Sequence, residues 1–166
     1  MLKIVTNNKG VTLIEILLYI GLLSIFLLVL VDIFMGGINL GLDTEATSAV
    51  QQDGKFILTR MMYDVSRADS VSQPATLGSS SSSLVLTIGG IVYTYSLNGS
   101  NLTLSQGGET LNLNGLGSQI TNLNFTRVGN VSGKPTFQVS ISLKSTTERS
   151  GNQFETRDFQ TTLGLR

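Results

Sequence analysis

The stretch that decides the fold is Gly10-Val11-Thr12-Leu13-Ile14-Glu15, which opens a largely apolar run that continues to Val31. At ~1.5 Å of rise per residue, a helix over this run is long enough to cross the ~30 Å hydrocarbon core of a membrane. Glu15 stands near the start of the run, where an ionised carboxylate is costly in lipid. Because such acids usually serve a function, the sequence predicts a role for Glu15 and a cationic partner for it.

The segment before the apolar run sets the predicted orientation. Residues 1–10 contain Lys3 and Lys9 and no acid, so the N-terminus is expected in the cytoplasm and the C-terminal part across the membrane. A secretory signal peptide would have a shorter apolar region and a cleavage site after it. A plain signal anchor is the other alternative, and an anchor alone gives no reason to keep Glu15 in the bilayer.

The hexapeptide, the Lys-containing leader and the apolar run together resemble the processing site of type IV prepilins and pseudopilins, in which Phe is commoner than Val11. The resemblance implies cleavage between Gly10 and Val11 by a prepilin peptidase, and N-methylation of Val11. It also implies that Glu15 is the docking charge that accepts the amine of a neighbouring subunit during assembly. The implied location is the inner membrane, as a single-pass protein with its C-terminal domain outside, and then a pilus or pseudopilus.

The further partners implied by the resemblance are other pilins or pseudopilins, the inner-membrane assembly platform and membrane lipid. Composition adds no others: Lys+Arg and Asp+Glu are both 11, so no net charge points to nucleic acid as a direct partner. Cys and His are both 0, which removes disulfides, thiol nucleophiles, imidazole bases and the usual zinc ligand sets. We expect no cofactor and no metal, and we do not expect an enzyme.

Residues 32–69 are expected to continue the helix with one face on a sheet. Gly36, Gly37 and Gly41 mark either a simple juxtamembrane segment or a place where the helix bends or melts. Beyond Asp43, apolar residues recur at helical spacing and predict a buried stripe of Ala46, Val50, Ile57, Met61, Val65 and Ala68. Four charged residues between them are expected on a solvated surface: Lys55, Arg60, Asp64 and Arg67. Of these, the pairs Arg60–Asp64 and Asp64–Arg67 stand at helix-neighbour spacings.

Residues 70–166 are expected to form a β-rich domain. The five serines Ser79–Ser83 indicate a flexible connection. Apolar residues then alternate with polar ones in about seven short segments, around 84–88, 91–97, 102–104, 111–113, 123–125, 137–143 and 159–165. Gly89-Gly90, Asn98-Gly99, Gly107-Gly108 and Asn114-Gly115 are expected turns, and the spacing places Tyr93 and Tyr95 in the core.

The predicted class is α+β, because one long helix precedes a series of strands. The resemblance implies a pilin-like fold, with the N-terminal helix packed on a mainly antiparallel sheet of about seven strands. The expected segments are a leader (1–10), a transmembrane or filament-core helix (11–31), its amphipathic continuation (32–69) and the β-rich domain (70–166).

Three functions are open at this point. Residues 54–68 and the closing strand from Phe159 resemble the J-type minor pseudopilins of type II secretion and the PilW-like minor pilins. A minor pilin or pseudopilin in a tip or initiation complex is therefore the leading hypothesis. The alternative is a pilus-mounted adhesin or ligand-binding module, which would need an exposed aromatic cluster or a groove on the sheet. A membrane-anchored enzyme would have only carboxylates to work with.

Overall fold

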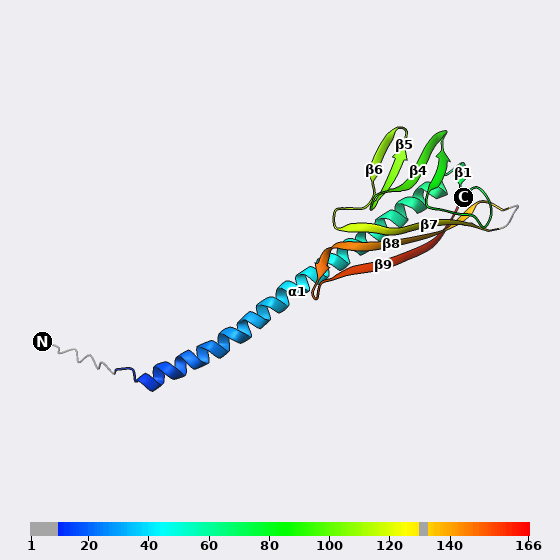
Figure 1. The fold of residues 1–166 in the computed structure, drawn as a ribbon. Helices are drawn as coiled ribbons and strands as arrows, with labels where there is room; N and C mark the ends of the chain where they lie inside the picture. Colours follow the sequence, from blue (N-terminus) through cyan, green and yellow to red (C-terminus); the bar gives the residue numbers. More distant parts are fainter. Residues whose placement is uncertain (1–9, 130–132) are drawn as a thin grey trace. The chain divides into compact units, whose positions relative to one another are not determined.

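A computed structural model describes residues 10–129 and 133–166, and in this part of the chain one helix precedes nine strands (Figure 1). Helix α1 runs from Leu13 to Ser66. The predicted leader, apart from Gly10, lies outside the described residues. The chain divides between Leu40 and Gly41 into two compact units, which are described in turn.

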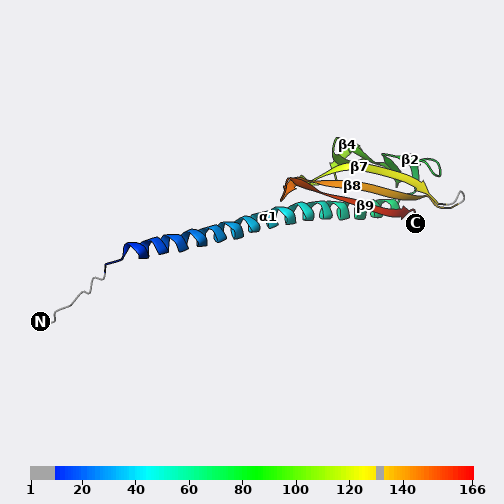
Figure 2. The same cartoon turned by 60° about the horizontal axis from the view of Figure 1, so that its bottom comes forward.

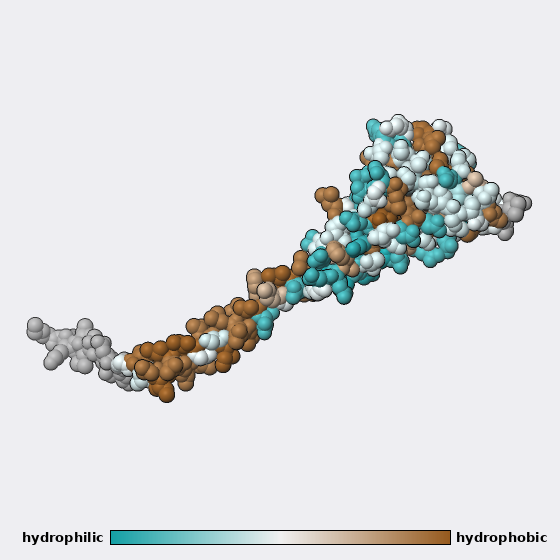
Figure 3. Space-filling model, viewed as in Figure 1, coloured by the Kyte–Doolittle hydropathy of each residue, from teal (hydrophilic) through white to brown (hydrophobic). Residues whose placement is uncertain are grey.

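In the first unit, helix α1 is apolar and uncovered. Every side chain from Val11 to Leu40 is exposed, and this part of α1 is brown in Figure 3. Gly36 and Gly37 lie inside the helix, with no described atom within 4 Å of where a Cβ would stand. These two glycines therefore do not end the helix.

The second unit holds the second half of α1 and all nine strands, which pair antiparallel throughout. The strands are β1 (Ser70–Gln73), β2 (Ser80–Ser81), β3 (Leu84–Ile88), β4 (Ile91–Asn98), β5 (Asn101–Gln106), β6 (Glu109–Asn112), β7 (Ser118–Val128), β8 (Thr136–Arg149) and β9 (Gln153–Gly164). They form a five-stranded sheet in the order β1-β3-β4-β5-β6 and a four-stranded sheet in the order β2-β7-β8-β9. Figure 2 shows this part of α1 lying along the sheets.

The expected α+β class and the helix packed on antiparallel strands are confirmed, but the single sheet of about seven strands is wrong. The seven alternating segments are β3 to β9. The two strands that the sequence did not predict, β1 and β2, are short and mostly polar, so they lack the alternation that marks a half-buried strand. Ser80 and Ser81 pair with Thr126 and Phe125, so the middle of the serine run is a strand and not a flexible connection.

The core lies between the second half of α1 and the inner faces of both sheets. Ala46, Val50, Ile57, Met61 and Val65 of the predicted stripe are buried, and Ala68 packs against the core just after the helix ends. Tyr95, Phe125 and Phe137 are among the largest fully buried side chains on the strands. Gly89 and Gly90 have φ of 56° and 80° and close the predicted β3–β4 hairpin, a backbone that favours glycine.

Close approach of the helix to the strands explains two small residues. A Cβ on Gly54 would lie 2.3 Å from Cζ of Phe159 on β9, so only glycine leaves room for the ring. A Cβ on Gly117 would lie 2.9 Å from that of Ala49. The sequence pattern did not identify Gly54 as part of the buried face, because glycine carries no hydrophobic signal.

Candidate functional site

The N-terminal end of α1 holds the residues that the sequence predicts to be functional. Gly10 and Val11 precede the helix and are exposed. Thr12 caps it: the Glu15 N–H lies 3.3 Å from Thr12 Oγ1 and 3.1 Å from the Thr12 carbonyl oxygen, which also accepts the N–H of Ile16. The bond between Gly10 and Val11 therefore lies in non-helical backbone directly before a capped helix.

The Glu15 carboxylate has a partner that the sequence analysis missed. The hydroxyl of Tyr19 donates a hydrogen bond of 3.0 Å to Glu15 Oε1. The two residues are four apart, so they are neighbours on one helix face. That spacing was visible in the sequence and could have indicated the contact. The structure thus brings Thr12, Glu15 and Tyr19 together at the start of the apolar run.

The part of α1 that follows this group is long and apolar enough to cross a membrane. None of its most apolar stretch is buried within the protein. An apolar surface of this kind requires cover from lipid or from other apolar helices.

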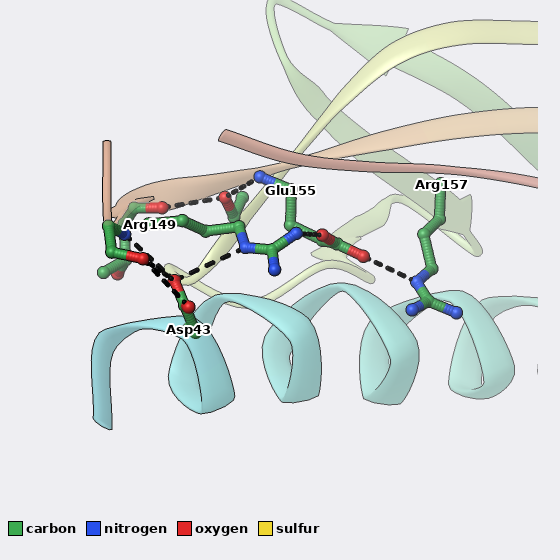
Figure 4. A network of polar contacts seen from close by, with 7 residues as sticks. Asp43, Arg149, Glu155 and Arg157 are labelled. Carbon is green, nitrogen blue, oxygen red and sulfur yellow. Dashed lines mark hydrogen bonds and ion pairs between the residues drawn. The ribbon is translucent and has the colours of Figure 1, made fainter. Parts of the chain in front are cut away.

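A second polar group lies at the start of the second unit's part of α1, where the β8–β9 hairpin meets Asp43 (Figure 4). The Asp43 carboxylate accepts hydrogen bonds from the N–H and hydroxyl of Ser150, and its Oδ1 lies 3.5 Å from Arg149 Nε. The Ser150 N–H is the main cause that lowers the pKa of Asp43, and Arg149 adds to it. The hairpin therefore holds the helix by charge-assisted contacts.

Glu155 on β9 completes this network, which we call the hairpin clamp: Asp43, Arg149, Ser150, Glu155 and Arg157. Glu155 is 8% exposed and accepts bonds from Arg157 Nε at 2.8 Å and from Arg149. The Arg157 bond is the main cause that lowers the pKa of Glu155. A break in the β8–β9 register between Lys144 and Glu148 precedes Arg149. The clamp joins residues more than a hundred positions apart, so local spacing gave no signal for it.

Two further acids attach α1 to the sheets. Asp53 Oδ2 accepts from the Gly115 N–H at 2.9 Å and from the Ser118 hydroxyl at 2.6 Å, which fixes the connection between β6 and β7. Asp64 accepts from Arg60 Nε at 2.9 Å and from the hydroxyl of Tyr95. Burial is the main cause that raises the pKa of Tyr95, and the hydrogen bond to Asp64 adds to it.

Asp64 corrects one expectation and supports another. It is 1% exposed, so its predicted place on a solvated surface is wrong. The predicted pair Arg60–Asp64 is confirmed, whereas Arg67 lies over the ring of Tyr63 and donates to its hydroxyl. A buried acid on a helix cannot be told from an exposed one by its neighbours in sequence, because its acceptor role depends on Tyr95, 31 residues away.

Within residues 10–129 and 133–166, no three acidic side chains gather in a way that could hold a metal ion. Tyr93 and Tyr95, the paired aromatic residues that an exposed binding face would use, are buried as predicted. Asp43, Asp53, Asp64 and Glu155 of the second unit serve as attachments between elements.

Comparison with known proteins gave no match: no family model, no curated protein and no solved structure resembles this chain closely enough to be reported.

Proposed function

We propose that this chain is a minor pilin or pseudopilin, a structural subunit that belongs to the tip or initiation complex of a type IV pilus or a type II secretion pseudopilus. The observation that carries the proposal is the group at the start of α1: an exposed, non-helical Gly10–Val11 bond, a capped helix end, and an acid in the first turn of an uncovered apolar helix. The second unit supplies a folded domain to be displayed outside the membrane.

In the proposed assembly, the two ends of the motif supply opposite charges: the amine of Val11 and the carboxylate of Glu15. Cleavage after Gly10 creates an amine on Val11, and a cation is the partner that a carboxylate in apolar surroundings requires. Glu15 of one subunit then accepts the amine of the next, while their apolar helices cover one another. The free subunit in the bilayer has lipid in place of those helices.

Gly10 supports the cleavage step in a further way. No described atom lies within 4 Å of where its Cβ would stand. Packing among the described residues therefore does not require glycine at this position. A peptidase cleft that admits only backbone next to the cut bond does require it.

The test is the mature N-terminus in cells that contain a prepilin peptidase. Intact mass should show loss of residues 1–10 and gain of one methyl group, and Edman sequencing of unmethylated protein should begin at Val11. Gly10→Leu should leave the precursor in the membrane, whereas Gly36→Ala, a control glycine within α1, should be trimmed as usual. A sequence that begins at Met1 or beyond Val31 contradicts the proposal.

A further inference from the structure

Tyr19 is the side chain that the proposed assembly mechanism leaves without a role. It is 57% exposed, and its hydroxyl donates to Glu15 Oε1 at 3.0 Å. An O–H that donates to a carboxylate makes one of the stronger hydrogen bonds available to side chains. In apolar surroundings neither group has water as an alternative partner, so the bond is expected to persist there.

The cap of α1 leaves the Glu15 carboxylate available for this bond. Thr12 and Glu15 stand at the spacing of a capping box, in which the acid would reach back to the N–H of Thr12. In the structure Thr12 accepts the N–H of Glu15, but the Glu15 carboxylate is bonded to Tyr19, one turn further along. The acid is thus turned along the helix face and does not serve its own helix end.

We propose that Tyr19 is a positioning residue for Glu15: it binds Oε1 and holds the carboxylate in one orientation, so that Oε2 is free to accept the N-terminal ammonium group of a second pilin chain. This inference rests on the proposed function. A carboxylate has two oxygens with about four acceptor sites, so one tyrosine hydroxyl leaves most of its capacity for the incoming cation.

The expected effect of Tyr19 on docking comes from the restricted rotamers of the Glu15 side chain and not from the strength of the Tyr19–Glu15 bond. The Tyr19–Glu15 bond is made both in the free subunit and in the assembled one, so its own strength cancels between the two states. What remains is the rotamer freedom that an unheld glutamate loses when it docks. Loss of the hydroxyl should therefore weaken docking by about three- to tenfold, the scale set by ordering one acidic side chain.

The first measurement concerns the bond in the full-length chain in lipid vesicles. With glutamate labelled by ¹³C at the side-chain carboxylate, the infrared difference between wild type and Glu15→Ala isolates the carboxylate stretch of Glu15. Tyr19→Phe, which removes only the hydroxyl, should shift that band. The matched control is Tyr63→Phe, because Tyr63 is 54% exposed on the same helix and its hydroxyl is bonded to Arg67. It should leave the band unchanged.

The second measurement is incorporation of the same variants into sheared filaments or crosslinked complexes with partner pilins. We expect Tyr19→Phe to be trimmed like the wild type, to be incorporated about three- to tenfold less, and to differ from Tyr63→Phe in this respect. An unshifted band, or a shifted band with wild-type incorporation, overturns the role of Tyr19 but leaves the proposed function standing. An untrimmed wild-type chain, absent from every filament, overturns the proposed function and with it the docking role of Tyr19.

Discussion

The two halves of helix α1 use their acidic residues in opposite ways. From Gly41 to Ser66, Asp43, Asp53 and Asp64 recur about every three helical turns, and each is bonded to a strand or to a loop between strands. From Leu13 to Leu40, the Glu15 carboxylate is bonded only to Tyr19 of its own helix within the described residues, and the Asp32 carboxylate makes no hydrogen bond there.

The difference indicates what each half is adapted to. In the second half, Asp43, Asp53 and Asp64 are bonded to strands or loops of the same chain, so they fix the register of the helix on the sheets. In the first half, apolar side chains and an incompletely bonded acid are displayed together. Such a surface becomes stable when another molecule supplies both apolar cover and a cation.

The largest expected effect is on assembly, through Glu15→Ala. Cleavage at Gly10–Val11 should proceed, because the acid stands a turn away from the bond. In the assembled state the Val11 amine would lose its carboxylate, at a cost of ~3 to 5 kcal/mol for a buried pair. Removal of the carboxylate should also make the free energy of helix insertion into lipid more favourable, by roughly 2 kcal/mol on insertion scales. Both effects favour the membrane pool.

The measurement is the amount of trimmed protein in the membrane fraction and in sheared filaments or crosslinked complexes. Glu15→Ala should be depleted from the assembled fraction. Asp32→Ala, the matched acid at the far end of the apolar run, should assemble as the wild type does. Equal incorporation of Glu15→Ala and the wild type would show that Glu15 is not the docking charge.

Asp64→Ala should cause the largest loss of folding stability. The change leaves the buried hydroxyl of Tyr95 and the guanidinium of Arg60 without their acceptor. The Arg60 side chain is 35% exposed and can turn to water, so the main cost is the unsatisfied buried hydroxyl of Tyr95, ~1 to 3 kcal/mol. Urea unfolding of the full chain in detergent, followed by tyrosine fluorescence, would measure this loss.

Glu109→Ala is the control for that experiment, because Glu109 is exposed on the edge strand β6. Its expected effect is within ~0.5 kcal/mol of zero. If Asp64→Ala and Glu109→Ala had similar midpoints, the buried acid would not be a register-fixing contact, and the contrast between the two halves of α1 would lose its basis.

The same substitution should change stability in opposite directions in the two halves. Gly→Ala in an exposed helix stabilises it by up to ~1 kcal/mol. Gly37→Ala should show this gain, because no described atom is near. Gly54→Ala places a methyl group against the Phe159 ring, and overpacking costs ~1 to 3 kcal/mol.

We therefore expect Gly54→Ala to lower the free energy of unfolding by about 1 kcal/mol after the helix gain is subtracted. Thermal melts by circular dichroism in detergent would compare the two variants. Stabilisation by both would mean that the Phe159 ring moves aside without cost, and that the close helix–strand contact is not a constraint.

The elements that the sequence predicted well are those with a strong local period. The alternation around Phe137–Leu143 and the helical spacing of Ile57, Met61 and Val65 each determine which face is buried, because side-chain direction follows from backbone geometry. The turn at Gly89-Gly90 was equally local, since its backbone requires glycine.

The features that the sequence did not predict depend on partners far along the chain. Strand β2 exists because Ser80 and Ser81 pair with β7, not because serine favours strands. The division into two sheets and the burial of Asp64 likewise follow from contacts between distant segments. At the candidate site, Glu15 was identified because a carboxylate is costly in lipid. Tyr19 was missed because a tyrosine within an apolar run was counted as an apolar residue, although its hydroxyl also donates a hydrogen bond.

The smallest expected effect is the acid sensitivity of the hairpin clamp. The folded state lowers the pKa of both Asp43 and Glu155, so in acid it binds fewer protons than the unfolded chain does. The stability that these groups contribute is complete above their unfolded pKa values, about 4. It is lost as the pH falls through their lowered folded values. The wild-type unfolding midpoint should therefore fall as the pH is lowered below about 5.

Asp43→Asn tests this contribution, because asparagine can still accept the Ser150 N–H but carries no charge to be protonated. The variant should be slightly less stable than the wild type at pH 7, since exposed ion pairs contribute little. Its unfolding midpoint should depend less steeply on pH in the acid range, so that the two curves approach each other as the pH falls below the unfolded pKa of about 4. Glu109→Gln, in which an exposed acid of β6 is changed, should keep the wild-type slope. If the curves for Asp43→Asn and the wild type ran parallel from pH 7 to 3, the charge of Asp43 would not stabilise the clamp. The hold of the hairpin on α1 would then rest on apolar contacts and on hydrogen bonds that do not need the charge of Asp43.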